Sequence, residues 1–285
     1  MTKGLRAGEE RLQVGSGQTI FLRTWHPETT PRAVVVIVHG FNSHSGEYLW
    51  VAQQLVGSGM AVYAADLRGR GKSDGERFFI DRLTDWVGDV ATVVGLAKSR
   101  EPGLPVFMLG HSAGGVVSCI YTLDHQQELA GLVCESFAHE LPAPDFALAV
   151  FKGLSHVAPH AHILRLKNED FSRDPAVVQS KNTDPLLAHE IQPTQVLAEL
   201  VRADERLKRE FPLITLPVLI LHGTADKATR PGGSQRFFNA TGSRDKTMKL
   251  YDGHFHDLLN DIGKEEVMTD ITRWIAAHVA AAAGV

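Results

Sequence analysis

The sequence of 285 residues contains only two cysteines, Cys119 and Cys134. Two cysteines cannot build a disulfide scaffold or a four-cysteine zinc ribbon. The chain also lacks an excess of positive charge, because 29 Lys and Arg residues stand against 33 Asp and Glu residues, a formal net charge of −4. A general nucleic-acid binder needs a basic surface, so we expect no nucleic-acid partner.

Long hydrophobic runs are missing as well. The longest branched apolar run, Ala33–Val38, is far shorter than the ~20 residues that span a bilayer. The first residues, 1–12, are charged and lack the apolar core of a secretory signal. We therefore expect a soluble, cytoplasmic protein.

What the sequence does contain is an alternation of strand and helix patterns. Continuous apolar runs, which are typical of strands buried on both faces, occur at Ala33–Val38, Met60–Ala65, Val106–Leu109, Leu129–Val133, Val218–Leu221 and Met248–Tyr251. Apolar residues at helical spacing lie between them, for example within 83–97. Residues 12–25 alternate around two glycines, which predicts an antiparallel hairpin. The sequence predicts an α/β fold with a mostly parallel sheet and helices on both faces.

Residues 141–215 interrupt this alternation, since they contain no convincing strand. The stretch is too long for an ordinary crossover. We expect an inserted helical cap here, on a core formed by residues 1–140 and 216–285. Within the cap, residues 146–157 are apolar around most of a helix. Either this helix packs on the core, or it is a lid that contacts apolar substrate or, transiently, a membrane surface.

The strongest sign of chemistry is the run Gly110-His111-Ser112-Ala113-Gly114. It matches G-x-S-x-G, follows a predicted strand and precedes an apolar helical run, which is the arrangement of a nucleophile elbow. Such an elbow displays the serine at the carboxyl edge of the sheet and aims the next backbone N–H at a developing oxyanion. Ser112 is therefore the candidate nucleophile and Ala113 a candidate oxyanion donor.

A serine nucleophile needs a base and an acid that orients it, and in this type of sheet both follow the serine in that chain order, acid before histidine. Asp226 comes just after the fifth predicted strand, and His254 and His256 both follow the sixth. Spacing does not choose between the two histidines, and Glu135, after the fourth strand, is an alternative acid. The second oxyanion donor should be the backbone N–H of Phe41, in the loop after the first buried strand.

Two other patterns carry less weight. Residues 66–73 include Gly-Lys-Ser, but Asp66 stands where the phosphate-binding P-loop requires glycine, so we interpret the segment as a tight glycine turn. His156, His160 and His162 lie close together in sequence without a carboxylate or thiolate beside them, and metal sites usually include one. The sequence predicts no metal and no organic cofactor.

Together these motifs resemble the α/β-hydrolase superfamily, and within it the monoacylglycerol lipase and lysophospholipase-like group, also called the serine aminopeptidase S33 or Hydrolase_4 group. The segments that carry the resemblance are His39–Tyr48, Asp66–Arg77, Gly110–Gly115, Ser172–Pro175, Asn182–Leu186, Gly223–Asp226 and Tyr251–His256. The resemblance implies an α/β-hydrolase fold with a helical cap over an apolar acyl tunnel. It also implies a catalytic triad of Ser112, Asp226 and His256, with Phe41 and Ala113 as oxyanion donors.

Four positions depart from that group. Many members carry Met where this sequence has Ala113, which does not affect a backbone donor. The group's monoacylglycerol lipases commonly carry Glu and Arg where this sequence has Ser43 and Glu47, in the stretch where glycerol is expected to bind. Arg70 stands where a histidine is common. We expect a serine carboxylic-ester hydrolase that acts on medium- or long-chain acyl esters, such as monoacylglycerols or lysophospholipids. The rival expectations are a short-chain or aryl esterase and, from another class, a ligand-binding protein on a hydrolase scaffold.

Overall fold

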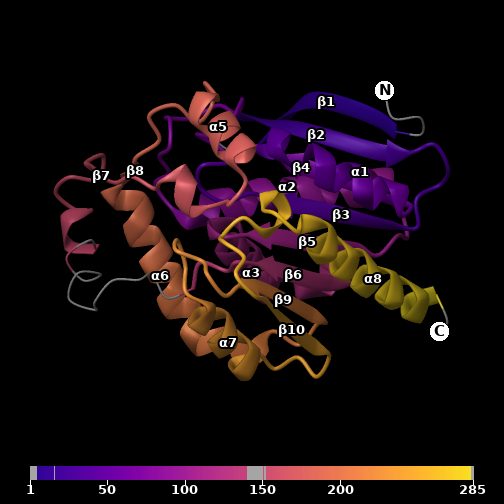
Figure 1. The fold of residues 1–285 in the computed structure, drawn as a ribbon. Coiled ribbons are helices and arrows are strands. Elements are labelled where there is room, and N and C mark those ends of the chain that lie inside the picture. Colours follow the sequence, from indigo (N-terminus) through magenta and orange to yellow (C-terminus); the bar gives the residue numbers. More distant parts are fainter. Residues whose placement is uncertain (1–4, 16, 140–149, 151, 284–285) are drawn as a thin grey trace.

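The computed structural model describes residues 5–15, 17–139, 150 and 152–283, and its centre is an eight-stranded sheet (Figure 1). In spatial order the strands are β1 (Leu5–Gln13), β2 (Thr19–Pro27), β4 (Met60–Ala65), β3 (Ala33–Val38), β5 (Val106–His111), β6 (Gly131–Glu135), β9 (Val218–Gly223) and β10 (Lys246–Tyr251). The first two form the predicted hairpin, β2 pairs antiparallel with β4, and all other neighbours pair in parallel. The predicted mostly parallel sheet is confirmed.

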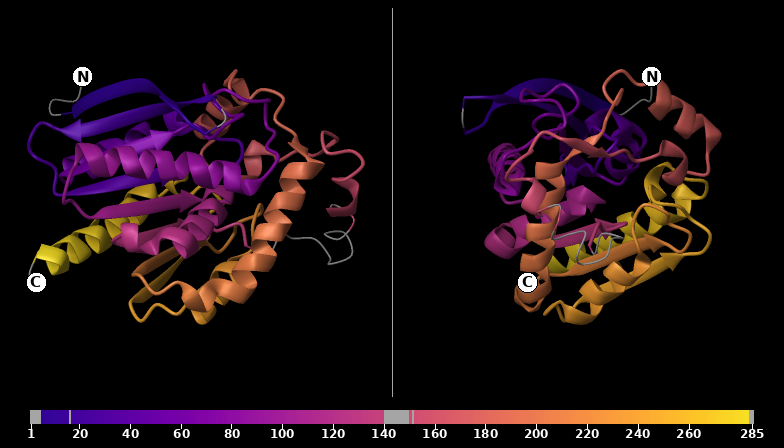
Figure 2. Two further views of the ribbon diagram at one scale, coloured as in Figure 1. Left: turned by 180° about the vertical axis from the view of Figure 1, so that it is seen from behind. Right: turned by 90° about the vertical axis from the view of Figure 1, so that its left-hand side faces the viewer.

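Helices cover both faces of the sheet, as Figures 1 and 2 show. One face packs against α1 (Leu49–Gly57) and α8 (Lys264–Ala283), and the other against α2 (Leu83–Arg100), α3 (Ala113–His125), α6 (Thr194–Glu210) and α7 (Pro231–Ala240). Strand β3 shows why both faces are needed. Val34 and Val36 belong to the α2 and α3 side, Val35 and Ile37 belong to the α1 and α8 side, and all four are buried. A strand without a polar face must be covered twice.

The inserted stretch between β6 and β9 differs in one respect from the sequence prediction. We call its described residues 152–215 the cap segment. It contains α5 (Pro175–Thr183) and α6, and also a two-stranded antiparallel ribbon of β7 (His162–Leu164) and β8 (Gln192–Pro193). The prediction that this stretch holds no strand was wrong, because strands of three and two residues are too short to show an alternating pattern. The predicted apolar helix at 146–157 falls partly outside the described residues.

Short 3-10 helices complete the described elements: η1 (Ser45–Tyr48), η2 (Gln126–Glu128), η3 (Asn168–Asp170), η4 (Phe211–Leu213) and η5 (Leu258–Asn260). The parallel strands all end at one edge of the sheet, and the cap elements α5, α6, β7 and β8 gather on that side, at the left of Figure 1. This edge is where open parallel sheets place their sites. None of the helices in the described part of the chain is long and apolar enough to cross a membrane.

Candidate active site

Ser112 occupies a strained turn between β5 and α3. Its backbone angles are φ 55° and ψ −120°, a conformation that a non-glycine residue adopts only when its surroundings impose it. The surroundings are tight, since a Cβ on Gly114 would lie 2.1 Å from the carbonyl oxygen of Val38. A Cβ on Gly110 would lie 2.4 Å from Ser118 Oγ. The two glycines of the G-x-S-x-G pattern are thus required by close backbone packing, and the serine is held at the carboxyl end of β5.

The structure brings Ser112, His256 and Asp226 into one hydrogen-bonded chain. Ser112 Oγ lies 2.8 Å from His256 Nε2, and His256 Nδ1 lies 2.8 Å from Asp226 Oδ2. His254 points elsewhere, with Nδ1 3.9 Å from a carboxylate oxygen of Asp261. Glu135 accepts a hydrogen bond from the backbone N–H of a residue in η5. Of the alternatives left open by spacing, the geometry therefore joins His256 and Asp226 to the serine.

The environment of Asp226 keeps it ionised. Its Oδ1 accepts the backbone N–H groups of Ala228 at 2.8 Å and Thr229 at 2.9 Å. Burial raises the pKa of Asp226, but the charge of His256 and the hydrogen bonds from His222 and His256 outweigh burial and hold the pKa well below its usual range. A carboxylate that stays charged can fix the His256 tautomer with its proton on Nδ1, which leaves Nε2 free to accept the serine proton.

The candidate oxyanion donors, Phe41 and Ala113, lie together beside Ser112. The contact between Gly40 and the elbow sets their approach, because a Cβ on Gly40 would lie 2.8 Å from Ser112 Cβ and 3.5 Å from Ala113 N. Phe41 and Ala113 both line the same cavity as Ser112 and His256. Two backbone N–H groups next to a nucleophile can hold the negative oxygen of a tetrahedral intermediate.

The cavity beside Ser112 has a volume of about 270 Å³ and a mostly apolar lining. Its apolar lining includes Phe41, Ala138, Leu164, Leu166, Phe171, Leu197 and Leu200, most of them from the cap segment. A second, polar cavity of about 210 Å³ shares Arg165, Leu166 and Lys167 with it. The second lining includes Asn168, Lys181 and other polar groups. Of the two cavities, the apolar one is lined by Ser112, and the polar one adjoins it through these three shared residues. An apolar cavity at a nucleophile suits the apolar part of a substrate.

The segment that resembles a P-loop is a structural turn. The Asp66 carboxylate accepts hydrogen bonds from the backbone N–H groups of Ser45 and Lys72, each at 2.7 Å. Gly71, at φ +50°, packs so closely on this carboxylate that a Cβ would lie 2.1 Å from Asp66 Oδ2. The glycines and the aspartate therefore hold the end of β4 to the segment between β3 and α1, residues 39–48. We call this segment the oxyanion loop after its candidate donor, Phe41. Backbone hydrogen bonds from Arg70 N to Leu67 O and from Ser73 N to Arg70 O close the turn, so the interpretation as a glycine turn is confirmed.

Arg70, the departure in that turn, is buried and faces the oxyanion loop. Its guanidinium carbon lies 4.6 Å from the centre of the Phe41 ring. The same guanidinium pairs with Glu190 and donates to Gln192 Oε1 at 2.9 Å, both in the cap segment. Arg70 therefore links the core, the oxyanion loop and the cap segment. No local pattern in the sequence predicts this role.

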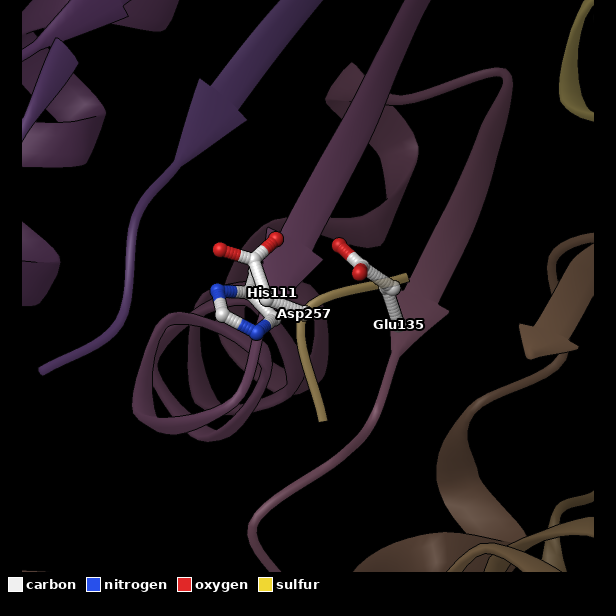
Figure 3. A group of neighbouring side chains, drawn as sticks. All are labelled: His111, Glu135 and Asp257. Carbon is white, nitrogen blue, oxygen red and sulfur yellow. The ribbon is translucent and has the colours of Figure 1, made fainter. Parts of the chain in front are cut away.

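A buried cluster of His111, Glu135 and Asp257 was also missed by sequence reasoning (Figure 3). Among the described residues it is the one group of three or more His, Cys, Asp or Glu side chains that could each offer one metal-ligand atom, with these atoms all within 4.8 Å of one another. Burial lowers the pKa of His111 to about 3, and burial together with Asp257 raises the pKa of Glu135 well above its usual range. Asp257 is already paired with a cation, since Lys181 Nζ lies 3.4 Å from its Oδ2. We interpret the cluster as a neutral imidazole and a protonated carboxyl packed around one charged pair.

The chain is similar to known proteins over most of its length. The family model described as serine aminopeptidase, S33 matches residues 29–263. The chain belongs to that family. The chain is 34% identical to the monoacylglycerol lipase of Mycolicibacterium smegmatis, over 92% of this chain and 95% of the relative. It is 32% identical to the human monoglyceride lipase, over 93% of this chain and 89% of the relative.

A solved structure agrees with this placement in the S33 family. The crystal structure of the Paleococcus ferrophilus monoacylglycerol lipase superposes with a TM-score of 0.82 at 31% identity, covering 91% of this chain and 99% of that chain. The α/β-hydrolase fold expected from the sequence is therefore confirmed. Within this S33 member, position 47 is a glutamate that binds Lys181 of the cap segment at 2.6 Å. The negative charge of Glu47, at a position where the group's monoacylglycerol lipases commonly carry Arg, is thus paired with a lysine from a distant part of the chain.

Proposed function

We propose that this protein is a serine ester hydrolase that releases the acyl chain of a monoacylglycerol or a similar single-chain lipid ester. The observation that carries the proposal is the hydrogen-bonded chain from Ser112 through His256 to Asp226, which opens on an apolar cavity of about 270 Å³. The similarity to monoacylglycerol lipases over more than nine-tenths of the chain supports the same substrate class.

The proposed reaction needs no group beyond this chain and water. His256 Nε2 takes the Ser112 proton as Oγ attacks the ester carbonyl, and the Phe41 and Ala113 N–H groups hold the oxyanion. His256 then gives the proton to the leaving alcohol, and the acyl group remains on Ser112. In the second half, His256 removes a proton from water as the water oxygen attacks the acyl carbonyl. His256 then returns that proton to Ser112 Oγ as the acyl–Oγ bond breaks and the fatty acid leaves. Asp226 keeps His256 in the productive tautomer and stabilises its transient charge.

We also propose that residues 141–215 form a cap that supplies the acyl cavity, on a core of 1–140 and 216–285. Leu197 and Leu200, three residues apart on α6, both face that cavity. Leu164 lines it as well and is 37% exposed. An exposed apolar side chain at the rim favours entry of an acyl chain from a lipid surface.

The test is fatty-acid release from 1-monoacylglycerols of increasing chain length, run beside short aryl esters, with Ser112→Ala as the blank. Strong release from medium or long chains supports the lipase function despite Ser43 and Glu47. Turnover confined to short aryl esters would keep the serine mechanism and make the protein a general esterase. A folded Ser112→Ala protein that still hydrolyses esters would overturn the assignment of the nucleophile.

A further inference from the structure

Helix α5 of the cap segment has one buried residue, and that residue is a lysine. The Lys181 side chain is 2% exposed, whereas the rest of α5 is exposed or half-buried. Taking an ammonium group out of water is costly unless carboxylates and hydrogen bonds compensate it fully. The burial of Lys181 therefore requires specific partners, and these partners indicate its role.

The ammonium group of Lys181 joins two loops of the core. It donates hydrogen bonds to Glu47 Oε2 at 2.6 Å and to the backbone oxygen of Asn42 at 3.1 Å. It also lies 3.4 Å from Asp257 Oδ2. Burial lowers the pKa of Lys181, but Glu47 and Asp257 outweigh burial and leave the pKa raised. Lys181 is thus a cation at neutral pH and binds both carboxylates at once.

The two loops that Lys181 joins carry the reacting groups of the proposed site. Asn42 follows Phe41, the candidate oxyanion donor, and Asp257 follows His256. The cap segment contacts the second loop at another point as well. The backbone N–H of Asp257 donates to Phe171 O at 2.8 Å, and the Phe171 ring packs edge-on against His256 with centroids 4.8 Å apart. Figure 3 shows Asp257 beside His111, which is the last residue of β5.

Asn42 depends on the cap segment for most of its polar contacts. Its backbone N–H donates to Glu190 Oε1 at 3.1 Å, and its Nδ2 donates to Asn168 Oδ1 at 2.9 Å. Its backbone oxygen accepts from Lys181. Asn42 has φ 48°, in the left-handed region that asparagine tolerates but does not prefer. Lys181 and Glu190 thus fix the peptide planes on both sides of a strained residue, immediately after the Phe41 donor.

We propose that Lys181 is a positioning residue for ester hydrolysis: its ammonium group binds the oxyanion loop to the histidine loop, so that the Phe41 N–H and His256 keep their alignment to Ser112. This inference rests on the proposed serine mechanism and adds to it a residue of the cap. The Lys181 side chain is buried against the two loops and does not line the cavity that contains Ser112. Its effect therefore falls on the transition state and not on the binding of the acyl chain.

The experiment compares Lys181→Met with the double variant Lys181→Met/Glu47→Gln, because the single change leaves the half-buried Glu47 carboxylate without its cation. Gln179→Met, on the exposed side of the same helix, is the matched control. We expect kcat on the best ester to fall about 10- to 100-fold in both Lys181 variants. We expect KM to change less than about threefold, since the acyl cavity is untouched.

A second readout separates positioning from general loosening. A long-chain trifluoromethyl ketone adds to Ser112, and the oxygen of the tetrahedral adduct accepts hydrogen bonds from the oxyanion donors. Because the adduct resembles the transition state, the affinity of the ketone should fall in proportion to kcat. The corresponding fatty alcohol occupies the acyl cavity alone, and its affinity should not change. A folded Lys181 variant with wild-type kcat and wild-type ketone affinity would overturn the proposal. Equal losses for ketone and alcohol would also overturn it, since they would mean that the cap had merely shifted.

The experiment also distinguishes this inference from the proposed function. A wild-type protein that hydrolyses no ester would contradict the function. The rate at which a fluorophosphonate labels Ser112 still tests Lys181 in that case, because phosphonylation also loads the oxyanion donors. Slower labelling in the Lys181 variants, and unchanged labelling in Gln179→Met, would support the positioning role. Labelling rates in both Lys181 variants that equal the rate in Gln179→Met would refute the positioning role.

Discussion

The backbone of Gly40 lies against the side chain of Ser112, so that a Cβ on Gly40 would be only 2.8 Å from Ser112 Cβ and 2.9 Å from the His111 carbonyl oxygen. The end of β3 and the elbow after β5 are neighbours because the two strands pair in parallel, with Val38 opposite Gly110. This contact brings the candidate donor Phe41 to the nucleophile. It leaves no room for any side chain at position 40.

The first prediction follows from that contact. Gly40→Ala should lower kcat by about 100-fold or more, because its methyl group must displace Ser112 or the oxyanion loop by several tenths of an ångström or more. Gly95→Ala is the control, since a Cβ there meets no atom within 4 Å and alanine favours a helix. Steady-state kinetics and thermal unfolding of both variants check this. Wild-type kcat in a folded Gly40→Ala protein would show that the oxyanion loop is not where we place it.

The second prediction concerns the charge on Asp226. In Asp226→Asn, the amide oxygen should keep the hydrogen bonds from the Ala228 and Thr229 N–H groups, which turns the NH₂ group toward His256 Nδ1. His256 then holds its proton on Nε2 and cannot accept the one from Ser112. We expect kcat to fall about 10³- to 10⁴-fold with little change in KM. Asp252→Asn, a nearby change off the triad, should keep full activity. A loss below tenfold in Asp226→Asn would mean that another group orients His256.

The third prediction tests the acyl cavity. Leu200 is 2% exposed and lines the cavity beside Ser112. Leu200→Trp should shorten the space for the acyl chain and lower kcat/KM for long-chain esters about tenfold or more, while short-chain esters keep most of their rate. Leu213→Trp, at a position that is 59% exposed, is the control. Equal loss at every chain length would place the acyl group elsewhere.

The fourth prediction concerns stability and pH. His39 is buried as a neutral ring, because its Nε2 accepts the Leu67 N–H at 3.0 Å and its Nδ1 donates to Gly40 O at 2.8 Å. Burial lowers its pKa to about 4. In the unfolded chain the pKa of His39 is about 6.5. Between about pH 6.5 and about pH 4 the unfolded chain therefore binds a proton at His39 that the folded chain does not bind. The free energy of unfolding consequently falls as the pH falls toward about 4.

The His39 contribution to that slope should be up to about 1.4 kcal/mol per pH unit, and it should vanish in His39→Gln. The measurement is the free energy of unfolding in urea at pH 7 and pH 5, for the wild type and the variant. The wild type should lose more stability than His39→Gln over this interval. A difference between the two proteins that does not change with pH would contradict the neutral, buried state of His39.

Local sequence patterns were sufficient for most of the fold. Strands β3 and β4 begin and end where the apolar runs do, because a strand buried on both faces needs uninterrupted apolar residues and its register follows from them. The G-x-S-x-G run similarly indicated the elbow. Its glycines are required by close contacts with residues a few positions away or on one neighbouring strand, so a short motif is enough to predict them. The ribbon of β7 and β8 was not predicted. Its two strands are too short to show an alternating pattern, and they pair across a segment that contains η3 and α5.

Local residue patterns therefore predict the sheet, the elbow and a short set of candidates for the acid and the base. Spacing left His254 and His256 open, and the family resemblance implied His256. The tertiary structure puts His256 against Ser112, a contact that depends on where two loops from different strands meet. Only the tertiary structure placed Lys181 against Glu47 and Asp257. Position 181 is 134 residues from Glu47, and its burial results from cap packing on the loops. Contacts between such distant segments leave no local period or motif, so no reading of α5 alone distinguishes this lysine from a solvated one.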